Sequence, residues 1–319
     1  MALPLACGAL GLGFAAQAVL RPVPPAEEGI LLEALTRQAP SPPGEARVAH
    51  RAPGAPVAAR RTPGPGGVPA LTEPAAGPPL PLEIRVALLQ LSPSPSLGAR
   101  GAWRLLDRSG RTLAAGGAGQ AVPLEQALAG RQEVQLVAAP GAALLADGRA
   151  YGGQFRILRQ GSGVLVVNHL PLEEYVSAVV GGEMPSGWNL EALRAQAVAA
   201  RSYALAHMAR PSNAHWHLGD TTRWQHYTGL GAVDARTLQA TRSTAGLILS
   251  YRGGIVESLY AATAQIAQEA HGHLGASMSQ HGAQELAEQG LSYNAILGHF
   301  YRGAALARLT RAAQTRAAQ

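Results

Sequence analysis

A glutamate between two glycines and a Met-Pro pair is the residue of this sequence best placed for proton-transfer chemistry. Glu183 follows Gly181-Gly182 and precedes Met184-Pro185. Glycines let a ligand approach the backbone closely and proline cannot continue a helix, so Glu183 is expected where a helix stops. Met184 and Trp188 are apolar neighbours, and a carboxyl group that they desolvate holds its proton more readily. Glu183 is thus a candidate general acid; the competing interpretation is a solvated loop glutamate.

Two helix patterns flank this glutamate and are expected to position it. The first begins at Pro171, carries Glu173 and Glu174 in its first turn, and is predicted to stop at Gly181-Gly182. The second follows Asn189, a residue type that caps helix N-termini. Its apolar residues recur at helical spacing, as expected for a helix that packs one face against a core. These residues are Leu190, Leu193, Ala197, Ala200 and Ala204.

The same stretch carries motifs that point to a known family. LPLEEY occupies residues 170–175, EMP occupies residues 183–185, and EALRAQAVAARSYA occupies residues 191–204. Their order and spacing resemble the SpoIID/LytB family, which contains stage II sporulation protein D and the amidase enhancers. The family members studied as enzymes are lytic transglycosylases of peptidoglycan, with the EMP glutamate as catalytic acid. The resemblance therefore implies that Glu183 is the catalytic residue of such an enzyme.

The resemblance also implies a reaction. The bond between the MurNAc and GlcNAc units of glycan strands would be cleaved, leaving 1,6-anhydro-MurNAc ends. One carboxyl group would serve as acid and then as base, so a second catalytic carboxylate is not required. Arg194 and Arg201, two turns apart on the second helix, are predicted to bind carboxylates of the glycan. The alternative for each is an ordinary helix-surface or core-pairing arginine.

Other segments extend the resemblance toward the C-terminus. Residues 220–229 (DTTRWQHYTG) resemble a family element in which Gln225 and Tyr227 would line the groove and contact sugar. A turn with packing aromatic residues explains these two residues equally well. Tyr260 matches the tyrosine that ends the next family element. Ser279 and Gln280 lie in an echo of the last family motif, G-H-G-x-G-M-S-Q-x-G-A, and are predicted, with Tyr260, to bind substrate.

The sequence departs from the family pattern after Tyr260. Residues 261–270 (AATAQIAQEA) lack the usual Gly-Gly and stand where a longer segment is expected, and Ala276-Ser277 looks like an insertion. A shortened segment predicts a more open groove and weaker binding. Three functions stay open: an active transglycosylase, a non-catalytic wall protein that enhances an amidase, and a truncated inactive family member. The setting of Glu183 favours the enzyme, because a pure binding protein does not need that acid.

Histidines raise the question of a metal site. His215 and His217 could share a strand face, and His271, His273 and His281 surround the last motif. Zinc sites are commonly completed by cysteines and steadied by orienting acids. The only cysteine of the chain lies at position 7, so we interpret these residues as ordinary polar histidines. Neither a metal ion nor another cofactor is predicted.

The composition is consistent with a basic, exported protein. The 319 residues carry a formal net charge of +6, and 47% of them are hydrophobic. A basic surface suits polyanions such as cell-wall polymers. No dense basic run is present, so nucleic acid is not a predicted partner. Residues 1–20 are apolar and contain Ala16-Gln17-Ala18, a small-x-small cleavage site, which predicts export to the periplasm or cell wall by a signal peptide or, alternatively, an uncleaved membrane anchor.

Four regions divide the chain. They are a leader at 1–20, a Pro/Ala/Gly-rich linker at 21–81 that is predicted to be disordered, a SpoIID/LytB-type domain at 82–303, and a basic tail at 304–319. Short alternating segments bounded by turn residues predict strands before the helical motifs. These segments are residues 83–91, 102–106, 111–114, 133–138, 153–158 and 163–168. Residues 233–244 and 292–300 predict helices, and residues 247–260 a hairpin. The predicted fold is α+β, a mixed, largely antiparallel sheet with the two motif helices packed against it.

Overall fold

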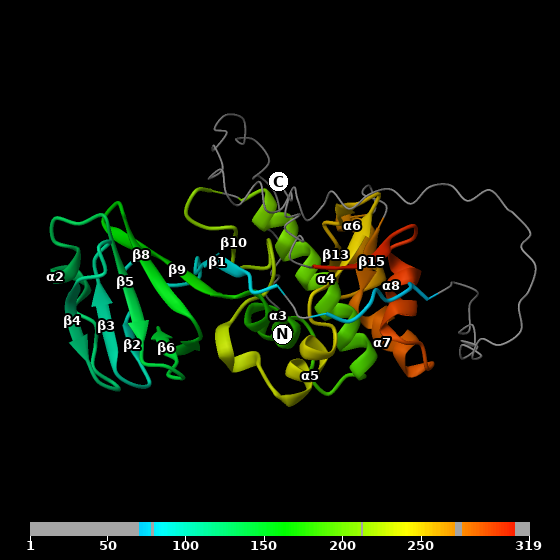
Figure 1. Ribbon diagram of the computed structural model, residues 1–319, viewed down its shortest axis with the longest axis horizontal. Coiled ribbons are helices and arrows are strands. Elements are labelled where there is room, and N and C mark those ends of the chain that lie inside the picture. The colour runs from blue at the N-terminus through cyan, green and yellow to red at the C-terminus, as the bar shows by residue number, and fades with distance from the viewer. Residues whose placement is uncertain (1–69, 78–79, 212, 272–275, 310–319) are drawn as a thin grey trace, which may run out of the picture.

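The computed structural model describes residues 70–77, 80–211, 213–271 and 276–309. The predicted leader, most of the predicted linker and the end of the predicted tail lie outside these residues. The described chain has an α+β fold, as predicted, with a sheet-rich part and a helical part arranged along the long axis (Figure 1). Within the described residues, no helix is both long enough and apolar enough to cross a lipid bilayer.

A seven-stranded sheet runs through the sheet-rich part. Its order is β10-β1-β9-β8-β5-β3-β4, and its neighbours are antiparallel except for β1 and β10. The strands are β1 (Glu83–Ala87), β3 (Trp103–Leu106), β4 (Thr112–Gly116), β5 (Glu133–Ala138), β8 (Gln154–Gln160), β9 (Gly163–Pro171) and β10 (Leu218–Gly219). Side chains alternate between the two faces of each strand. In β8, Phe155 and Ile157 are buried in the core, whereas Gln154 and Arg156 lie on the opposite, polar face.

Three short strands that the sequence pattern did not predict form a separate sheet. They are β2 (Leu97–Ala99), β6 (Leu144–Ala146) and β7 (Arg149–Tyr151), in the order β2-β6-β7. A short helix, α2 (Leu124–Leu128), lies between β4 and β5 in the chain. Each of these strands has three residues, too few for alternation to show. Their apolar side chains nevertheless join the main hydrophobic core.

One helix, α4 (Leu190–Ala209), is the centre of the helical part. Around it pack α3 (Leu172–Glu183), α5 (Ala235–Ser243), α7 (Gln280–Glu288) and α8 (Tyr293–Phe300). The sequence predicted one buried face, but nearly every residue from Ala192 to Ala206 is buried. Alanines recur along the helix, and their small side chains let neighbouring elements approach on all sides. A helix surrounded in this way needs no polar face.

Two small sheets, the helix α6 (Ala264–His271) and the 3-10 helix η1 (Gly229–Ala232) complete the described chain. In one sheet β11 (Leu247–Tyr251) lies between β12 (Gly254–Ile255) and β15 (Ala305–Arg308). The predicted hairpin turns at Arg252 and Gly253, whose φ angles of 49° and 82° suit a two-residue loop. Its second strand is shorter than predicted, because β13 (Leu259–Ala261) pairs in parallel with β14 (Ser277–Ser279) instead. This pairing places Tyr260 beside Met278, within the Met-Ser-Gln part of the last motif.

The folded part extends beyond the predicted domain at both ends. Leu71, in the predicted linker, exchanges hydrogen bonds of 3.1 and 2.9 Å with Asn294 of α8. Glu73 accepts a 2.5 Å hydrogen bond from the Tyr293 hydroxyl and faces Arg308 at 3.4 Å. Arg308 belongs to β15, within the predicted tail. The predicted boundaries at 81 and 304 are therefore corrected outward, because segments from both sides of the domain pack together.

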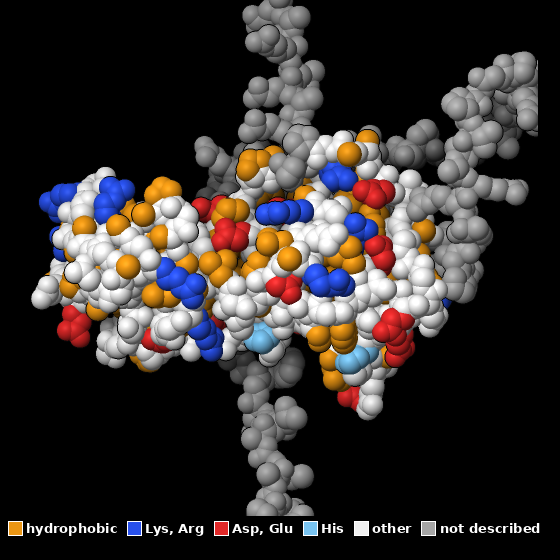
Figure 2. Space-filling view, turned by 90° about the horizontal axis from the view of Figure 1, so that it is seen from below, with side chains coloured by type: hydrophobic (Ala, Val, Ile, Leu, Met, Phe, Trp, Pro, Cys, Tyr) orange, Lys and Arg blue, Asp and Glu red, His pale blue; other side chains and the backbone are white. Residues whose placement is uncertain are grey.

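Charged side chains are dispersed on the face shown in Figure 2. Basic side chains stand in small separate groups over both parts of the molecule, with acidic and hydrophobic side chains between them. A nucleic-acid-binding face would present a concentrated basic patch or stripe. This face presents none.

Candidate active site

Glu183 is the last residue of α3, as the Met-Pro pair indicates. Met184 is extended (φ −131°, ψ 142°) and buried, and its N–H still donates to the Val180 carbonyl at 3.0 Å. The prediction that Gly181-Gly182 ends the helix is wrong, since both glycines are helical. They are needed for packing: a Cβ at Gly181 would overlap the backbone of Ala232, and a Cβ at Gly182 would overlap the backbone of His226. The glycines therefore let a second segment reach the helix end.

Two uncharged donors hold the Glu183 carboxyl group, which is half-buried. The backbone N–H of His226 donates to Oε1 at 2.8 Å, and the side-chain amide of Gln280 donates to Oε2 at 3.2 Å. The His226 ring reinforces the first contact, because its Nδ1 lies 3.0 Å from the Gly182 carbonyl oxygen. The carboxyl group is thus fixed by segments 43 and 97 positions away in the sequence.

Gln225 and Tyr227 are buried, so the prediction that they line a groove is corrected. Gln225 accepts a 2.8 Å hydrogen bond from the Tyr175 hydroxyl and donates to the Tyr260 hydroxyl at 2.8 Å and to the Ala200 carbonyl at 3.1 Å. The Tyr227 hydroxyl donates to Asn168 at 2.7 Å. Both side chains have no exposed surface. They attach the segment that carries His226 to α3, α4 and the sheet, as the packing-aromatic alternative implies.

Tyr260 and Ser279 have different surroundings. Tyr260 is half-buried, and burial raises the pKa of its hydroxyl well above its usual value, with the charge of Glu183 adding to the effect. The hydroxyl therefore stays protonated, and it accepts a hydrogen bond from Gln225. Ser279 is buried and caps α7, with its Oγ accepting from the Gly282 N–H at 3.0 Å. Ser279 thus orients Gln280 rather than facing a ligand, which corrects its predicted role.

The two predicted carboxylate-binding arginines are occupied inside the protein. Arg201 has no exposed surface, and its Nε and Nη2 bind the two oxygens of Glu173 at 2.8 and 2.6 Å. Its Nη1 donates to the Leu247 carbonyl at 3.0 Å. Arg194 donates to Glu191 at 2.7 Å and to Ser243 at 2.9 Å. Both fit the alternative interpretation of pairing within the protein, and the binding role predicted for Arg201 is corrected because a ligand cannot reach it.

The comparisons with known proteins cover the segment that carries Glu183. The family model described as stage II sporulation protein matches residues 160–251, which include Glu183 and His226. This segment of the chain therefore matches the SpoIID/LytB family. It is 34% identical over 88 residues to the amidase enhancer of Bacillus subtilis, covering 28% of this chain and 12% of that protein. It is 33% identical over 112 residues to stage II sporulation protein D of the same organism, covering 30% and 33%.

A third relative is an uncharacterized protein of Brachyspira hyodysenteriae, 34% identical over 117 residues that cover 36% of this chain and 32% of the relative. The chain thus spans about a third or less of the length of these relatives. Gln280 lies outside the segment that the SpoIID/LytB family model matches, at 160–251. Its contact with Glu183 therefore shows that the departure after Tyr260 still allows the last family motif to reach the glutamate.

Sequence reasoning missed an exposed cation, Arg223, and its neighbour Trp224 in the family element at 220–229, together with Trp216, which precedes that element. The guanidinium of Arg223 lies 5.1 Å from the ring centre of Trp224, and Trp224 meets Trp216 edge-on at 5.6 Å. Burial is the main cause of the raised pKa of Tyr203. The charge of Glu183 raises this pKa as well, whereas the charge of Arg223 lowers it. Arg223 is thus within electrostatic reach of the same tyrosine as Glu183. The adjacent Arg223 and Trp224, directly before Gln225, could have indicated this site. They were missed because the family element specifies no residue type at these two positions.

Two of the histidines considered as metal ligands, His217 and His281, have other contacts in the structure. His217 is buried, and its ring nitrogens lie 3.0 and 3.1 Å from the backbone and side-chain nitrogens of Arg85. Burial lowers its pKa to about 3. The His281 ring packs against Trp188 at 4.9 Å, while His273 and the side chain of His271 lie outside the described residues. Across the described part, no group of three His, Cys, Asp or Glu residues could hold a metal ion.

Asp220 is a buried acid at the start of the segment that carries His226. Its Oδ1 accepts from the Leu89 N–H at 2.9 Å, whereas Oδ2 is buried without a partner among the described residues. Burial raises the pKa of Asp220 to about 6 from its usual 3.8. The folded protein therefore binds one more proton than the unfolded chain between these two pKa values. Stability from this group is present at low pH and is lost as the pH rises through about 6.

Asp220→Asn is expected to remove this pH dependence. Asparagine can keep the hydrogen bond from the Leu89 N–H without carrying a charge. The free energy of unfolding of the variant should therefore exceed that of the parent at pH 7.5. The gain has an upper bound of about 3 kcal/mol, and it should shrink toward zero near pH 4. Urea unfolding of both proteins at pH 4, 5, 6 and 7.5 measures it. A constant difference across these pH values would contradict the assignment.

Proposed function

We propose that this protein is a lytic transglycosylase that cleaves peptidoglycan glycan strands, with Glu183 as its catalytic carboxyl group. The contact between Glu183 and Gln280 carries the proposal, because it joins the two most distant motifs around one acid. The match to the SpoIID/LytB family supports a role in the cell wall. Such a role also favours action outside the cytoplasm, as residues 1–20 predict.

The reaction needs one carboxyl group in two successive roles. The protonated Glu183 donates to the glycosidic oxygen as the bond from the muramic C1 to that oxygen breaks. The resulting carboxylate takes the proton of the C6 hydroxyl of the same sugar, whose oxygen attacks C1 and closes the anhydro ring. No water is consumed, and Glu183 is protonated again at the end.

The surroundings of Glu183 suit this scheme. Its described hydrogen-bond partners are the amides of His226 and Gln280 and not a second carboxylate. A second carboxylate is needed when an external water or the enzyme is the nucleophile, and here the nucleophile belongs to the substrate. Two fixed donors also keep the carboxyl group in one position between the two proton transfers, which preserves its alignment.

Arg223 is exposed and lies within electrostatic reach of Tyr203, as Glu183 does, and it is our candidate to recognise a carboxylate on the muramic unit. Arg223→Gln is expected to raise KM by roughly tenfold or more, since a hydrogen bond to a charged group contributes about 1.5–3 kcal/mol, with kcat little changed. Arg194→Gln should leave KM unchanged, because that side chain pairs with Glu191 and Ser243. Steady-state cleavage of glycan strands measures both variants. A raised KM only in Arg194→Gln would restore the assignment made from the sequence.

The proposal is tested by identifying the product. Purified full-length protein is incubated with glycan strands from which the peptides have been removed, and the ends are analysed by mass spectrometry. Ends that are one water lighter than a hydrolysis product, increasing with time, are the expected result. Reducing ends formed by hydrolysis would contradict the transglycosylase chemistry.

A second candidate function is enhancement of a cell-wall amidase without cleavage of the glycan. The observation that favours it is the similarity to the amidase enhancer of Bacillus subtilis. Adding the protein to an amidase and intact peptidoglycan tests this function. Faster release of peptides, together with no change in the glycan strands, would support the enhancer and exclude the enzyme.

A further inference from the structure

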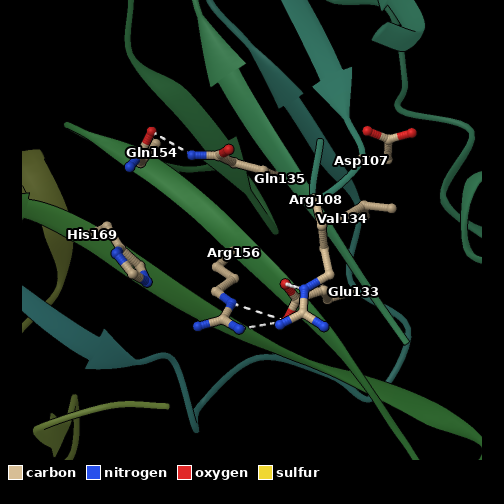
Figure 3. Close-up of a pocket in the computed structure, with 8 residues that line it drawn as sticks. All are labelled: Asp107, Arg108, Glu133, Val134, Gln135, Gln154, Arg156 and His169. Atoms are coloured by element: carbon tan, nitrogen blue, oxygen red, sulfur yellow. Dashed lines mark hydrogen bonds and ion pairs between the residues drawn. The ribbon is translucent and has the colours of Figure 1, made fainter. Parts of the chain in front are cut away.

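A second polar site lies on the face of the seven-stranded sheet that is turned away from the core (Figure 3). A cavity of about 180 Å³ opens there, lined by residues of β5, β8 and β9 and of the turn between β3 and β4. Its lining residues are Asp107, Arg108, Glu133, Val134, Gln135, Gln154, Arg156 and His169. None of them contacts Glu183, so this cavity is separate from the site described above.

One carboxylate in this cavity is held by two guanidinium groups. Arg108 Nε lies 2.8 Å from Glu133 Oε1, and Arg156 reaches Oε2 through Nε at 3.1 Å and through Nη2. The triad has a net positive charge. The Arg108 side chain is 77% exposed, and its Nη atoms and Arg156 Nη1 have no partner among the described residues. Guanidinium groups with free planar donors bind carboxylates in a bidentate manner.

The other lining groups offer neutral hydrogen bonds. Gln135 Nε2 donates to Gln154 Oε1 at 2.7 Å, which leaves the Gln154 amide donors and the Gln135 oxygen available. His169 Nδ1 lies 2.9 Å from Glu83 Oε1, and this hydrogen bond lowers the pKa of Glu83. His169 Nε2 is buried without a partner in the described chain. Buried polar atoms are almost always paired, so this nitrogen can form a hydrogen bond with a ligand group.

We propose that this cavity binds a peptide that carries a free carboxylate. The choice of peptide rests on the proposed function, because the stem peptides of peptidoglycan have this chemistry. The cavity is smaller than the ~300–1,000 Å³ that encloses a whole small molecule, so it fits an end group of a larger ligand. His169 precedes α3 and Glu183 ends it, and a helix of 12 residues spans about 18 Å. The His169 edge of the cavity and Glu183 therefore lie at opposite ends of one helix, and a glycan strand that carries stem peptides has chemical groups for both sites.

The test uses the full-length protein and a synthetic stem pentapeptide, L-Ala-γ-D-Glu-L-Lys-D-Ala-D-Ala, in isothermal titration. A second peptide has both carboxylates converted to amides. Arg108→Gln is expected to weaken binding of the first peptide by roughly 10–100-fold. Arg111→Gln is the matched control, because Arg111 lies in the same turn, is 70% exposed and pairs with Asp107, yet does not line the cavity. Its binding should equal that of the parent.

The peptide-binding results test the proposed cavity site, and they are independent of whether the protein cleaves glycan strands. Binding of the charged peptide alone, lost in Arg108→Gln and kept in Arg111→Gln, supports the site even if the protein cleaves no glycan. Equal binding of both peptides, equal loss in both variants, or no binding by the parent would overturn it. Cleavage of peptide-free strands would be unaffected by that result, so the proposed function could still hold.

Discussion

Glu183→Gln is expected to lower the rate of anhydro-end formation by at least ~10²–10⁴-fold, the range that general acid–base catalysis supplies. We expect the loss of rate to be at least this large because one carboxyl group performs both proton transfers. The amide oxygen can still accept from the His226 N–H, and the Gln280 amide can rotate to present its oxygen to the new donor. The fold should therefore be intact. Initial rates by mass spectrometry and the thermal unfolding midpoint measure the two effects.

A matched control separates loss of the acid from loss of charge. Glu288→Gln changes an exposed glutamate on α7, the helix that carries Gln280, and Glu288 only accepts a 2.7 Å hydrogen bond from Gln284. Its rate should equal that of the parent. Cleavage by Glu183→Gln at the parental rate would show that another group is the acid. A parent that stimulates an amidase while cleaving no glycan would leave the binding function in place of the enzyme.

The features that the sequence predicted correctly depend on residues that are close together in the chain. The end of α3 at Glu183, the N-cap at Asn189 and the hairpin turn at Arg252 each follow from residue types a few positions apart. The fold class also followed, because strand alternation and helical spacing are both local patterns. The helix stop at Gly181-Gly182 failed for an instructive reason. Glycine ends helices, but it also permits close contact, and here a distant backbone makes that contact.

The sequence did not predict which of the motif side chains are buried or which distant residues pair with them. The motifs identify Gln225, Tyr227, Arg201 and Ser279 as special, but a motif does not state whether a side chain faces a ligand or holds the loop that does. The donors to Glu183 come from 43 and 97 positions away. Short strands such as β2 and β10 gain their stability from partners rather than from their own residues. These features are set by tertiary packing.

Arg201→Ala is expected to destabilise the protein by about 3 kcal/mol or more, rather than to weaken substrate binding. Removing one partner of a buried ion pair typically costs 3–5 kcal/mol, because the other charge is left without its partner. The side chain of Glu173 is 31% exposed, so water can compensate it in part and the lower end applies. The variant also loses the bond from Nη1 to Leu247, which ties α4 to β11. Urea unfolding measures the change as a lower midpoint with an unchanged slope.

A double variant tests whether the pair itself is responsible. Arg201→Met fills the buried space without a charge, and Glu173→Gln removes the carboxylate that it would leave alone. The two changes together should destabilise less than the sum of the single changes, since residues in direct contact are coupled. Glu173 also accepts a 3.2 Å hydrogen bond from the Gly246 N–H, which glutamine can keep. If Arg201→Ala instead unfolds like the parent and raises KM, then Arg201 does bind substrate and the carboxylate role predicted from the sequence was right.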